Sequence, residues 1–174
     1  MKKILMILGI AASVLMISCQ KDPVENTATM ATAGQWYVQI DGVDASGNLP
    51  DESYADIYGL GNVMFLTFNT AANKADEMMV SDLGDFWDFQ IVVKCDQNAL
   101  TFGNTAEVEN LSYDCNVLLT NGKITLNGAQ TPSGKPADAI EFDITFDDDD
   151  APAMYGFDHY KVHGYRYTGL ANDN

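Results

Sequence analysis

The stretch HGYRYTGL, residues 163–170, decides the fold that this sequence predicts. It has the composition of a β-strand, and we pair it with GQWYV, residues 34–38, at the start of the expected domain. In that pairing Trp36 plugs one end of an apolar core, and the guanidinium of Arg166 lies across its indole face. Gly34 and Trp36 on a first strand, with an arginine on the last, are what a closed β-barrel needs where its ends meet.

The two residues also have plainer interpretations. Taken singly, Trp36 is an ordinary core aromatic and Arg166 is a surface cation on a strand. Their positions at the two ends of the domain favour the barrel, and the pairing is similar to the lipocalin, or calycin, signature. The main alternative is a β-sandwich, which would leave Arg166 without its tryptophan.

Short strands separated by turns account for most of residues 34–174. The clearest lies at 86–94, where alternate apolar side chains share one face: Trp87, Phe89, Ile91 and Val93. Asn121-Gly122 lies between two β-prone runs and predicts a tight hairpin, because both residues tolerate positive φ. Without a convincing amphipathic helix, the sequence predicts an all-β fold, a single antiparallel lipocalin-like barrel of about eight to ten strands.

One connection, residues 43–61, is long for a link between strands. It fits a loop that covers one mouth of the barrel. Four of its side chains would pack as a lid: Tyr54, Ile57, Tyr58 and Leu60. Disorder of this segment is the alternative.

Residues 1–18 resemble a bacterial lipoprotein signal peptide. Two lysines precede an apolar run at 4–17 that is short for a membrane span. A small residue directly before Cys19 resembles the lipobox, in which the thiol is acylated and the chain is cut before the cysteine. We therefore expect a lipid anchor on Cys19 and a flexible tether over residues 19–33. An ordinary secretory signal and an uncleaved anchor are the alternatives.

The net charge limits the partners that the protein can bind. The net charge of −16 repels nucleic acid and anionic membranes, so we expect membrane attachment only through the acylated Cys19.

Cys95 and Cys115 lie on neighbouring expected strands, where an oxidising compartment would allow a disulfide. The alternative is that both are small buried side chains. Neither has a cysteine or histidine at the spacing of a metal site.

Several segments together resemble a known family. They are NGKI at 121–124, SGKP at 133–136 with IEF at 140–142, the aspartate-rich turn at 147–150, and VHGYRYTG at 162–169. Together they are similar to Bacteroidetes-type lipoproteins named lipid-binding putative hydrolases. The resemblance covers most of the chain after the tether, and the GYR-x-TG ending is its most specific part. It implies a lipocalin-like barrel on an outer-membrane lipoprotein that faces the periplasm or the cell surface.

The sequence contains no recognisable catalytic motif. No serine lies in a Gly-x-Ser-x-Gly elbow, and His159 and His163 lack the spacing of a zinc hydrolase. The four aspartates at 147–150 fit a solvated turn better than a calcium site, since they lack EF-hand spacing. We therefore expect no catalytic residue, no metal and no cofactor.

The function expected from the sequence is the binding of a small apolar or amphipathic, lipid-like molecule inside the barrel. The expected lining is a set of alternating apolar residues: Phe65, Phe68, Trp87, Phe89, Ile91, Phe142 and Ile144. These residues also fit a fully packed core. The alternatives are a non-catalytic accessory module of an envelope complex and a hydrolase.

Overall fold

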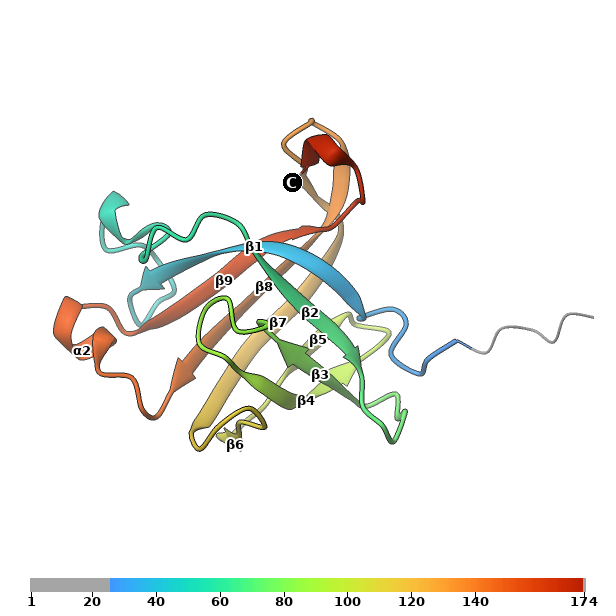
Figure 1. The fold of residues 1–174 in the computed structure, drawn as a ribbon, viewed down its shortest axis with the longest axis horizontal. Helices are drawn as coiled ribbons and strands as arrows, with labels where there is room; N and C mark the ends of the chain where they lie inside the picture. Colours follow the sequence, from blue (N-terminus) through green and yellow to red (C-terminus); the bar gives the residue numbers. More distant parts are fainter. Residues whose placement is uncertain (1–25, 174) are drawn as a thin grey trace, which may run out of the picture.

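The computed structural model describes residues 26–173, which form one antiparallel β-sheet that curls round on itself (Figure 1). The order of strands is β5-β4-β3-β2-β1-β9-β8-β7-β6. The strands are β1 (Gly34–Val43), β2 (Val63–Asn69), β3 (Glu77–Ser81), β4 (Gln90–Asp96), β5 (Thr101–Gly103), β6 (Val108–Glu109), β7 (Asn116–Gln130), β8 (Pro136–Phe146) and β9 (His159–Arg166). Cys19 and the expected signal peptide lie outside the described residues.

A further pairing of β5 with β7 closes eight of these strands into a barrel. Phe102 of β5 lies opposite Gly122 of β7, while β6 adds a ninth short strand through Val108 and Val117. The predicted all-β antiparallel barrel is therefore confirmed. The described helical turns are short: η1 (Glu52–Tyr54), α2 (Ala151–Tyr155) and η2 (Ala171–Asp173). No helix in this part of the chain is long and apolar enough to cross a membrane.

The first and last strands of the chain, β1 and β9, pair with each other as predicted, and Trp36 lies directly opposite Arg166. Trp36 is fully buried. The Arg166 guanidinium covers its ring, donates from Nε to Asp138 at 3.0 Å, and donates from a terminal nitrogen to the Ala33 carbonyl at 2.7 Å. A Cβ atom on Gly34 would overlap this guanidinium, so the glycine leaves the space that the arginine occupies.

The predicted hairpin at Asn121-Gly122 is wrong. β7 continues through both residues, and the pairing of β7 with β8 instead shifts register between Thr120 and Lys123. Asn121 has a φ of 55°. Positive φ occurs in β-bulges as well as in tight turns, so this conformation fits the shift in register. Gly122 lies so close to Phe102 that a Cβ would overlap it, so this position serves the β5–β7 closure.

The ordered domain begins before Gly34, in residues expected to belong to the tether. Thr29 and Thr32 are both buried. The Ala33 amide donates to the Thr29 carbonyl at 2.9 Å, which closes a turn, and the Thr67 hydroxyl of β2 donates to the Thr32 carbonyl at 2.6 Å. Threonines and alanines make up most of this turn and show no apolar periodicity, so the sequence pattern did not reveal it.

The long connection after β1 folds over one end of the barrel, as expected for a lid. The Ile57 amide donates to the Ile40 carbonyl of β1 at 3.0 Å, and the Ile57 side chain packs against the core. The Tyr54 hydroxyl donates to the Tyr155 carbonyl of α2 at 2.9 Å. Figure 1 shows this segment and α2 at the same end of the barrel.

Candidate functional site

The structure separates the seven expected lining residues into three groups. Five of them lie inside the barrel and are at most 1% exposed: Phe65, Phe89, Ile91, Phe142 and Ile144. Phe68 lies on the outer face of β2, opposite Met79 of β3, and is half-buried. Trp87 precedes β4, so the strand expected at 86–94 begins later than predicted, and Trp87 lies at the end of the barrel instead.

The interior residues pack tightly against one another. The ring centroid of Phe65 is 5.6 Å from that of Phe89 and 6.1 Å from that of Phe142. The ring of Phe102, on β5, packs against that of Phe142, with centroids 5.7 Å apart. These are contact distances for aromatic pairs. The side chains expected to line a cavity therefore fill the centre of the barrel as a core.

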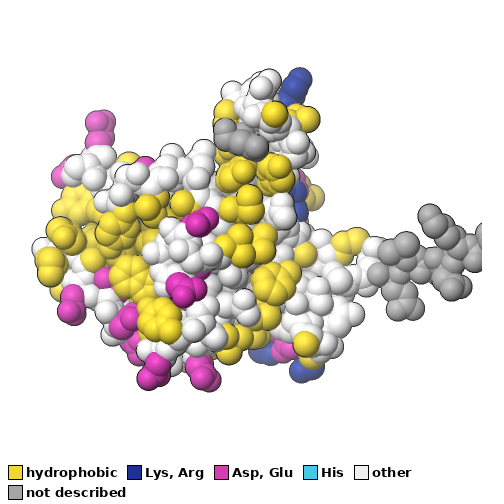
Figure 2. All heavy atoms as spheres, viewed as in Figure 1, with side chains coloured by type: hydrophobic (Ala, Val, Ile, Leu, Met, Phe, Trp, Pro, Cys, Tyr) yellow, Lys and Arg dark blue, Asp and Glu magenta, His cyan; other side chains and the backbone are white. Residues whose placement is uncertain are grey.

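An apolar groove lies outside this core, at the lid end of the barrel, and we call it the mouth. It has a volume of about 540 Å³ and is lined by Tyr58, Leu60, Phe86, Trp87, Ala151, Met154 and Tyr155. The lining comes from the lid, the loop before β4, and α2. Figure 2 shows hydrophobic side chains gathered at the end of the molecule where α2 lies in Figure 1.

One buried carboxylate fixes the loop that carries Phe86 and Trp87. Asp82 is fully buried, and its two oxygens accept hydrogen bonds of 2.6–3.1 Å from five backbone amides, those of Gly84, Phe86, Trp87, Asp88 and Phe89. Backbone amides that converge in this way form an anion nest. The arrangement bends the chain so that Phe86 and Trp87 leave the strand and reach the mouth.

Aromatic contacts hold the floor of the mouth in place. Trp87 stacks on Phe146 with centroids 4.9 Å apart and an interplanar angle of 21°. Phe86 meets Tyr160 edge-on at 5.1 Å, and Phe157 meets Tyr160 at 5.0 Å. The groove therefore has a rigid aromatic base, while Met154 and Tyr155 above it are 70% and 59% exposed.

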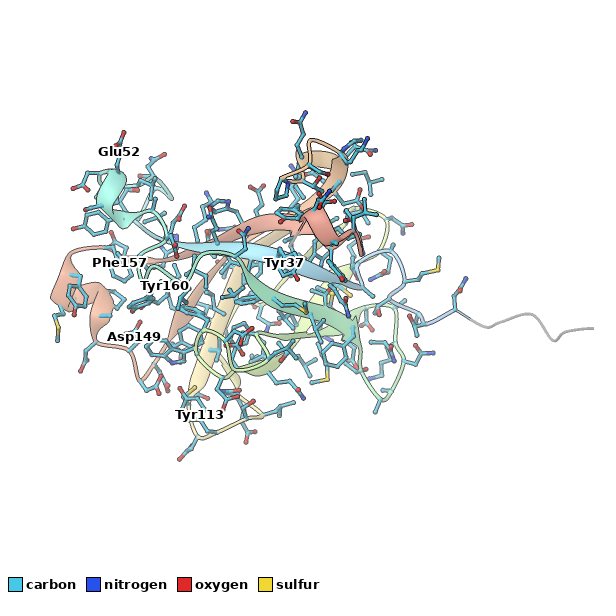
Figure 3. The ribbon with its side chains drawn as sticks, turned by 45° about the horizontal axis from the view of Figure 1, so that its top comes forward. Tyr37, Glu52, Tyr113, Asp149, Phe157 and Tyr160 are labelled. Atoms are coloured by element: carbon cyan, nitrogen blue, oxygen red, sulfur yellow. The ribbon has the colours of Figure 1, made fainter. Side chains whose placement is uncertain are left out.

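Polar groups lie along the edge of this base. The Tyr160 hydroxyl donates to Asp149 Oδ2 at 2.6 Å and lies 2.5 Å from the Tyr58 hydroxyl. Burial, followed by the bonds to Asp149 and Tyr58, raises the pKa of Tyr160 above its ordinary value, so this hydroxyl keeps its proton. Figure 3 shows Asp149, Tyr160 and Phe157 together at this end.

The aspartate-rich turn proves to be more than a solvated turn. Asp148 accepts from the Trp87 indole at 3.2 Å and from the Tyr113 hydroxyl at 2.8 Å. Asp149 also accepts from the Ala151 amide at 2.8 Å. The turn thus fixes aromatic residues of the mouth, a role that four consecutive acids do not signal by themselves.

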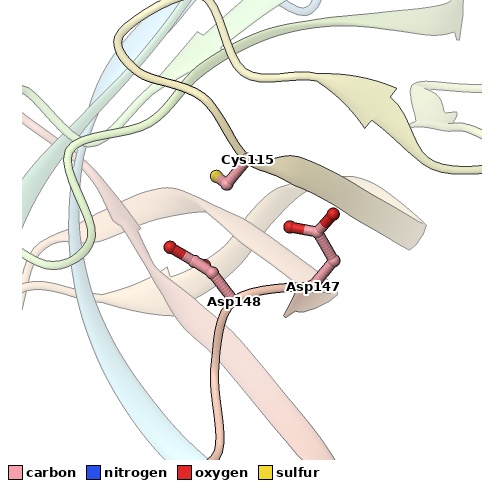
Figure 4. A group of neighbouring side chains, drawn as sticks. All are labelled: Cys115, Asp147 and Asp148. Carbon is pink, nitrogen blue, oxygen red and sulfur yellow. The ribbon is translucent and has the colours of Figure 1, made fainter.

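Two aspartates of the same turn lie beside a cysteine in an arrangement that could hold a metal ion. Ligand atoms of Cys115, Asp147 and Asp148 lie within 4.8 Å of one another (Figure 4). Both Asp147 oxygens already accept hydrogen bonds from Asn116 at 2.8 Å, and both Asp148 oxygens are engaged as described above. These hydrogen bonds account for the cluster without a cation.

The two cysteines are both free. Cys95 lies on β4, while Cys115 directly precedes β7, and β5 separates these strands in the sheet. Cys115 is buried beside the Asn110 amide, with a nitrogen–sulfur distance of 3.4 Å. The possible disulfide is therefore not formed, because the expected neighbouring strands are not neighbours.

The two histidines line grooves other than the mouth. His159 lines a polar groove of about 530 Å³ that also includes Ser46, Asp143 and Lys161. Its Nε2 atom is 3.6 Å from Asp143, and it has no hydrogen-bond partner among residues 26–173. His163 lies 2.9 Å from Asp41. No hydrogen bond in the described part joins either histidine to a hydroxyl or thiol, so no acid–base–nucleophile relay is formed there.

Comparison with known proteins adds one finding to this geometry. A family model described as "lipid-binding putative hydrolase" matches residues 21–171, which include every strand of the barrel and the whole mouth. No curated protein matches the chain. The match covers most of the sequence and agrees with the resemblance carried by the GYR-x-TG ending, and the barrel fits a lipid-binding role. The chain therefore belongs to the family of lipid-binding putative hydrolases.

Proposed function

We propose that this protein is a lipoprotein of the cell envelope, anchored by acylation of Cys19, whose mouth binds a small hydrophobic or amphipathic molecule. The observation that supports the binding role is the apolar groove formed by the lid, the loop before β4 and α2. We call the loop before β4, residues 82–89, the Asp82 loop. The signal-like segment and the lipobox-like cysteine support the anchor, and a lipid-anchored protein of this kind would lie at the outer membrane and face the periplasm or the surface.

The mouth is a better binding site than the interior that the sequence suggested. The interior aromatic rings are in contact, so a ligand there would have to displace them. The groove is open, and its volume of about 540 Å³ lies within the range of small-molecule sites. Each ligand methylene buried in it contributes about 0.8 kcal/mol, so binding should strengthen with the length of the apolar chain.

The test compares molecules retained by three forms of the chain beginning at Gln20, which contains every described strand and the whole mouth. Each is incubated with a lipid mixture and extracted for mass spectrometry. The wild type is expected to retain an amphiphile, Met154→Asp to lose it, and Leu126→Asp to keep it. Leu126 is a matched control because it is 61% exposed on β7, outside the groove. Empty wild-type extracts, or equal retention by both variants, would overturn the proposal.

A second candidate function is an accessory module that docks a protein through the same surface. Its support is the exposure of Met154, Tyr155, Leu60 and Tyr58, which together form an apolar patch larger than isolated surface residues make. Photo-crosslinking from position 155 in intact cells separates the two functions. A discrete protein adduct, with empty lipid extracts, would favour the module.

A further inference from the structure

We propose that the mouth selects amphiphiles with a cationic head group, a primary or quaternary ammonium, over neutral and anionic ones. This rests on the proposed function and adds the class of ligand. Two independent features of the mouth carry it, the sign of the charges around the groove and the direction of its hydrogen bonds.

The charges around the groove are all of one sign. None of its seven lining residues is basic. Three acidic residues directly adjoin the lining in sequence, Asp85, Asp88 and Asp150, and Asp149 is one position further away. In Figure 2, acidic side chains surround the hydrophobic patch, and the basic side chains in view lie toward the other end of the molecule. A cation therefore enters a favourable potential, while a carboxylate or phosphate head group enters an unfavourable one.

The direction of the hydrogen bonds around the groove also favours a cationic head group. Tyr160 donates its only hydroxyl proton to Asp149, so the Tyr58 hydroxyl must donate to Tyr160. The Trp87 indole likewise donates to Asp148. These donors are engaged within the protein, and what remains for a ligand is the Tyr58 oxygen lone pairs and carboxylate oxygens. The hydroxyl of Tyr155, on a 59% exposed side chain, is the exception.

The aromatic lining suits the same head group. Tyr58, Phe86 and Trp87 come from two different loops and line one groove. Aromatic rings attract alkylammonium groups through their π faces, and a quaternary ammonium needs no hydrogen-bond acceptor. A basic residue would favour an anionic head group, and the lining has neither a lysine nor an arginine. Apolar tail and cation can thus be held in the same groove.

The test uses three probes with the same twelve-carbon tail: dodecyltrimethylammonium, dodecyl maltoside and dodecanoate. Each is titrated below its micelle concentration into the chain beginning at Gln20 at low salt, and binding is measured by calorimetry. We expect the cation to bind at least tenfold more tightly than the neutral probe, and the anion to bind least. Raising the salt concentration should narrow the difference, because the acids are solvent-accessible.

Matched variants separate a local effect from the general acidity of the chain. Asp88→Asn with Asp150→Asn removes two exposed charges beside the lining, and Asp76→Asn with Glu141→Gln removes two exposed charges elsewhere. The first pair should lower the preference for the cation severalfold, and the second should leave it nearly unchanged. Equal effects of the two pairs, or a wild type that binds cation and neutral probe alike, would overturn the inference.

Failure of this inference differs from failure of the proposed function. If the neutral probe binds as tightly as the cation, and Met154→Asp abolishes the binding of both, the groove is a binding site without charge selection. If none of the three probes binds, both proposals fall.

Discussion

The guanidinium carbon of Arg166 lies 4.2 Å from the centroid of the Trp36 ring, directly across the seam between the first and last strands of the barrel. The arginine is also hydrogen-bonded to Asp138 on β8, so it ties three adjacent strands to the residue that plugs the core. Gly34 contributes by having no Cβ at the point where the guanidinium passes.

Arg166→Ala should lower the free energy of unfolding by about 3 kcal/mol, through the loss of two charge-assisted hydrogen bonds and a cation–π contact. Gly34→Ala should cost about 1–2 kcal/mol in the wild type but less in the Arg166→Ala background, because the overlap with the guanidinium disappears and only the 3.2 Å contact with Trp36 remains. Urea unfolding of the four proteins measures this coupling, with Lys123→Ala as the control. Additive effects would show that Gly34 and Arg166 act independently.

Asp82→Asn should destabilise the protein by about 2–4 kcal/mol, because two or three of the five backbone amides would face an NH2 group and the others would keep only an uncharged acceptor. The Asp82 loop would loosen, and amphiphile binding should weaken with it. Asp85→Asn, an exposed change in the same loop, should alter neither the stability nor the affinity for the neutral probe, dodecyl maltoside. Chemical unfolding and calorimetric titration test the pair. An unchanged affinity in a folded Asp82→Asn protein would show that the nest does not position the mouth.

The sequence predicted the elements that depend on local alternation or on a specific pair. Phe89, Ile91 and Val93 face inward as their spacing requires, and the closed barrel follows from the two chain ends. The mouth was not predictable in the same way. Trp87 continues the alternation of β4 in the sequence, yet the amide nest around Asp82 bends it out of the strand.

The other predictions that differ from the structure failed for a similar reason. Asn121-Gly122 carries the signal of a hairpin because positive φ is common to turns and bulges, and the contact of Gly122 with Phe102 decides between them. The aspartates at 147–150 look solvated until Tyr160 and Trp87 are placed beside them. In each case a contact between residues distant in sequence selects one of two local structures, so local patterns cannot distinguish them.

Asp173 should make the stability of the barrel sensitive to acid. Hydrogen bonds from Ser133 and Thr168 lower the pKa of this carboxyl to about 2, from an ordinary value of 3.8. A lowered pKa stabilises the folded state above pH 4, and this contribution is lost as the pH falls from about 4 through 2. Urea unfolding of wild type and Asp173→Asn across this range should show their stability difference shrinking. A constant difference would mean that Asp173 contributes no pH dependence.

Acylation of the chain should depend on one cysteine. In a bacterial host with lipoprotein processing, wild-type protein should incorporate labelled fatty acid and fractionate with membranes, and Cys19→Ser should do neither. Cys95→Ser is the control, since Cys95 is a free cysteine within the barrel domain. Labelling is read by gel fluorography and location by fractionation. Label that persists in Cys19→Ser would contradict the proposed anchor.

Tyr160→Phe should change both stability and ligand preference. Removing its hydroxyl leaves Asp149 Oδ2 without its donor and costs about 1–2 kcal/mol in the free energy of unfolding. It also frees the Tyr58 hydroxyl to donate to a ligand, so the discrimination against dodecanoate should weaken about threefold. Tyr54→Phe removes another hydroxyl at the same end without touching Tyr58 and should leave the preference unchanged. If Tyr160→Phe binds the three probes in the wild-type order and ratios, the direction of these hydrogen bonds does not set the selectivity of the mouth.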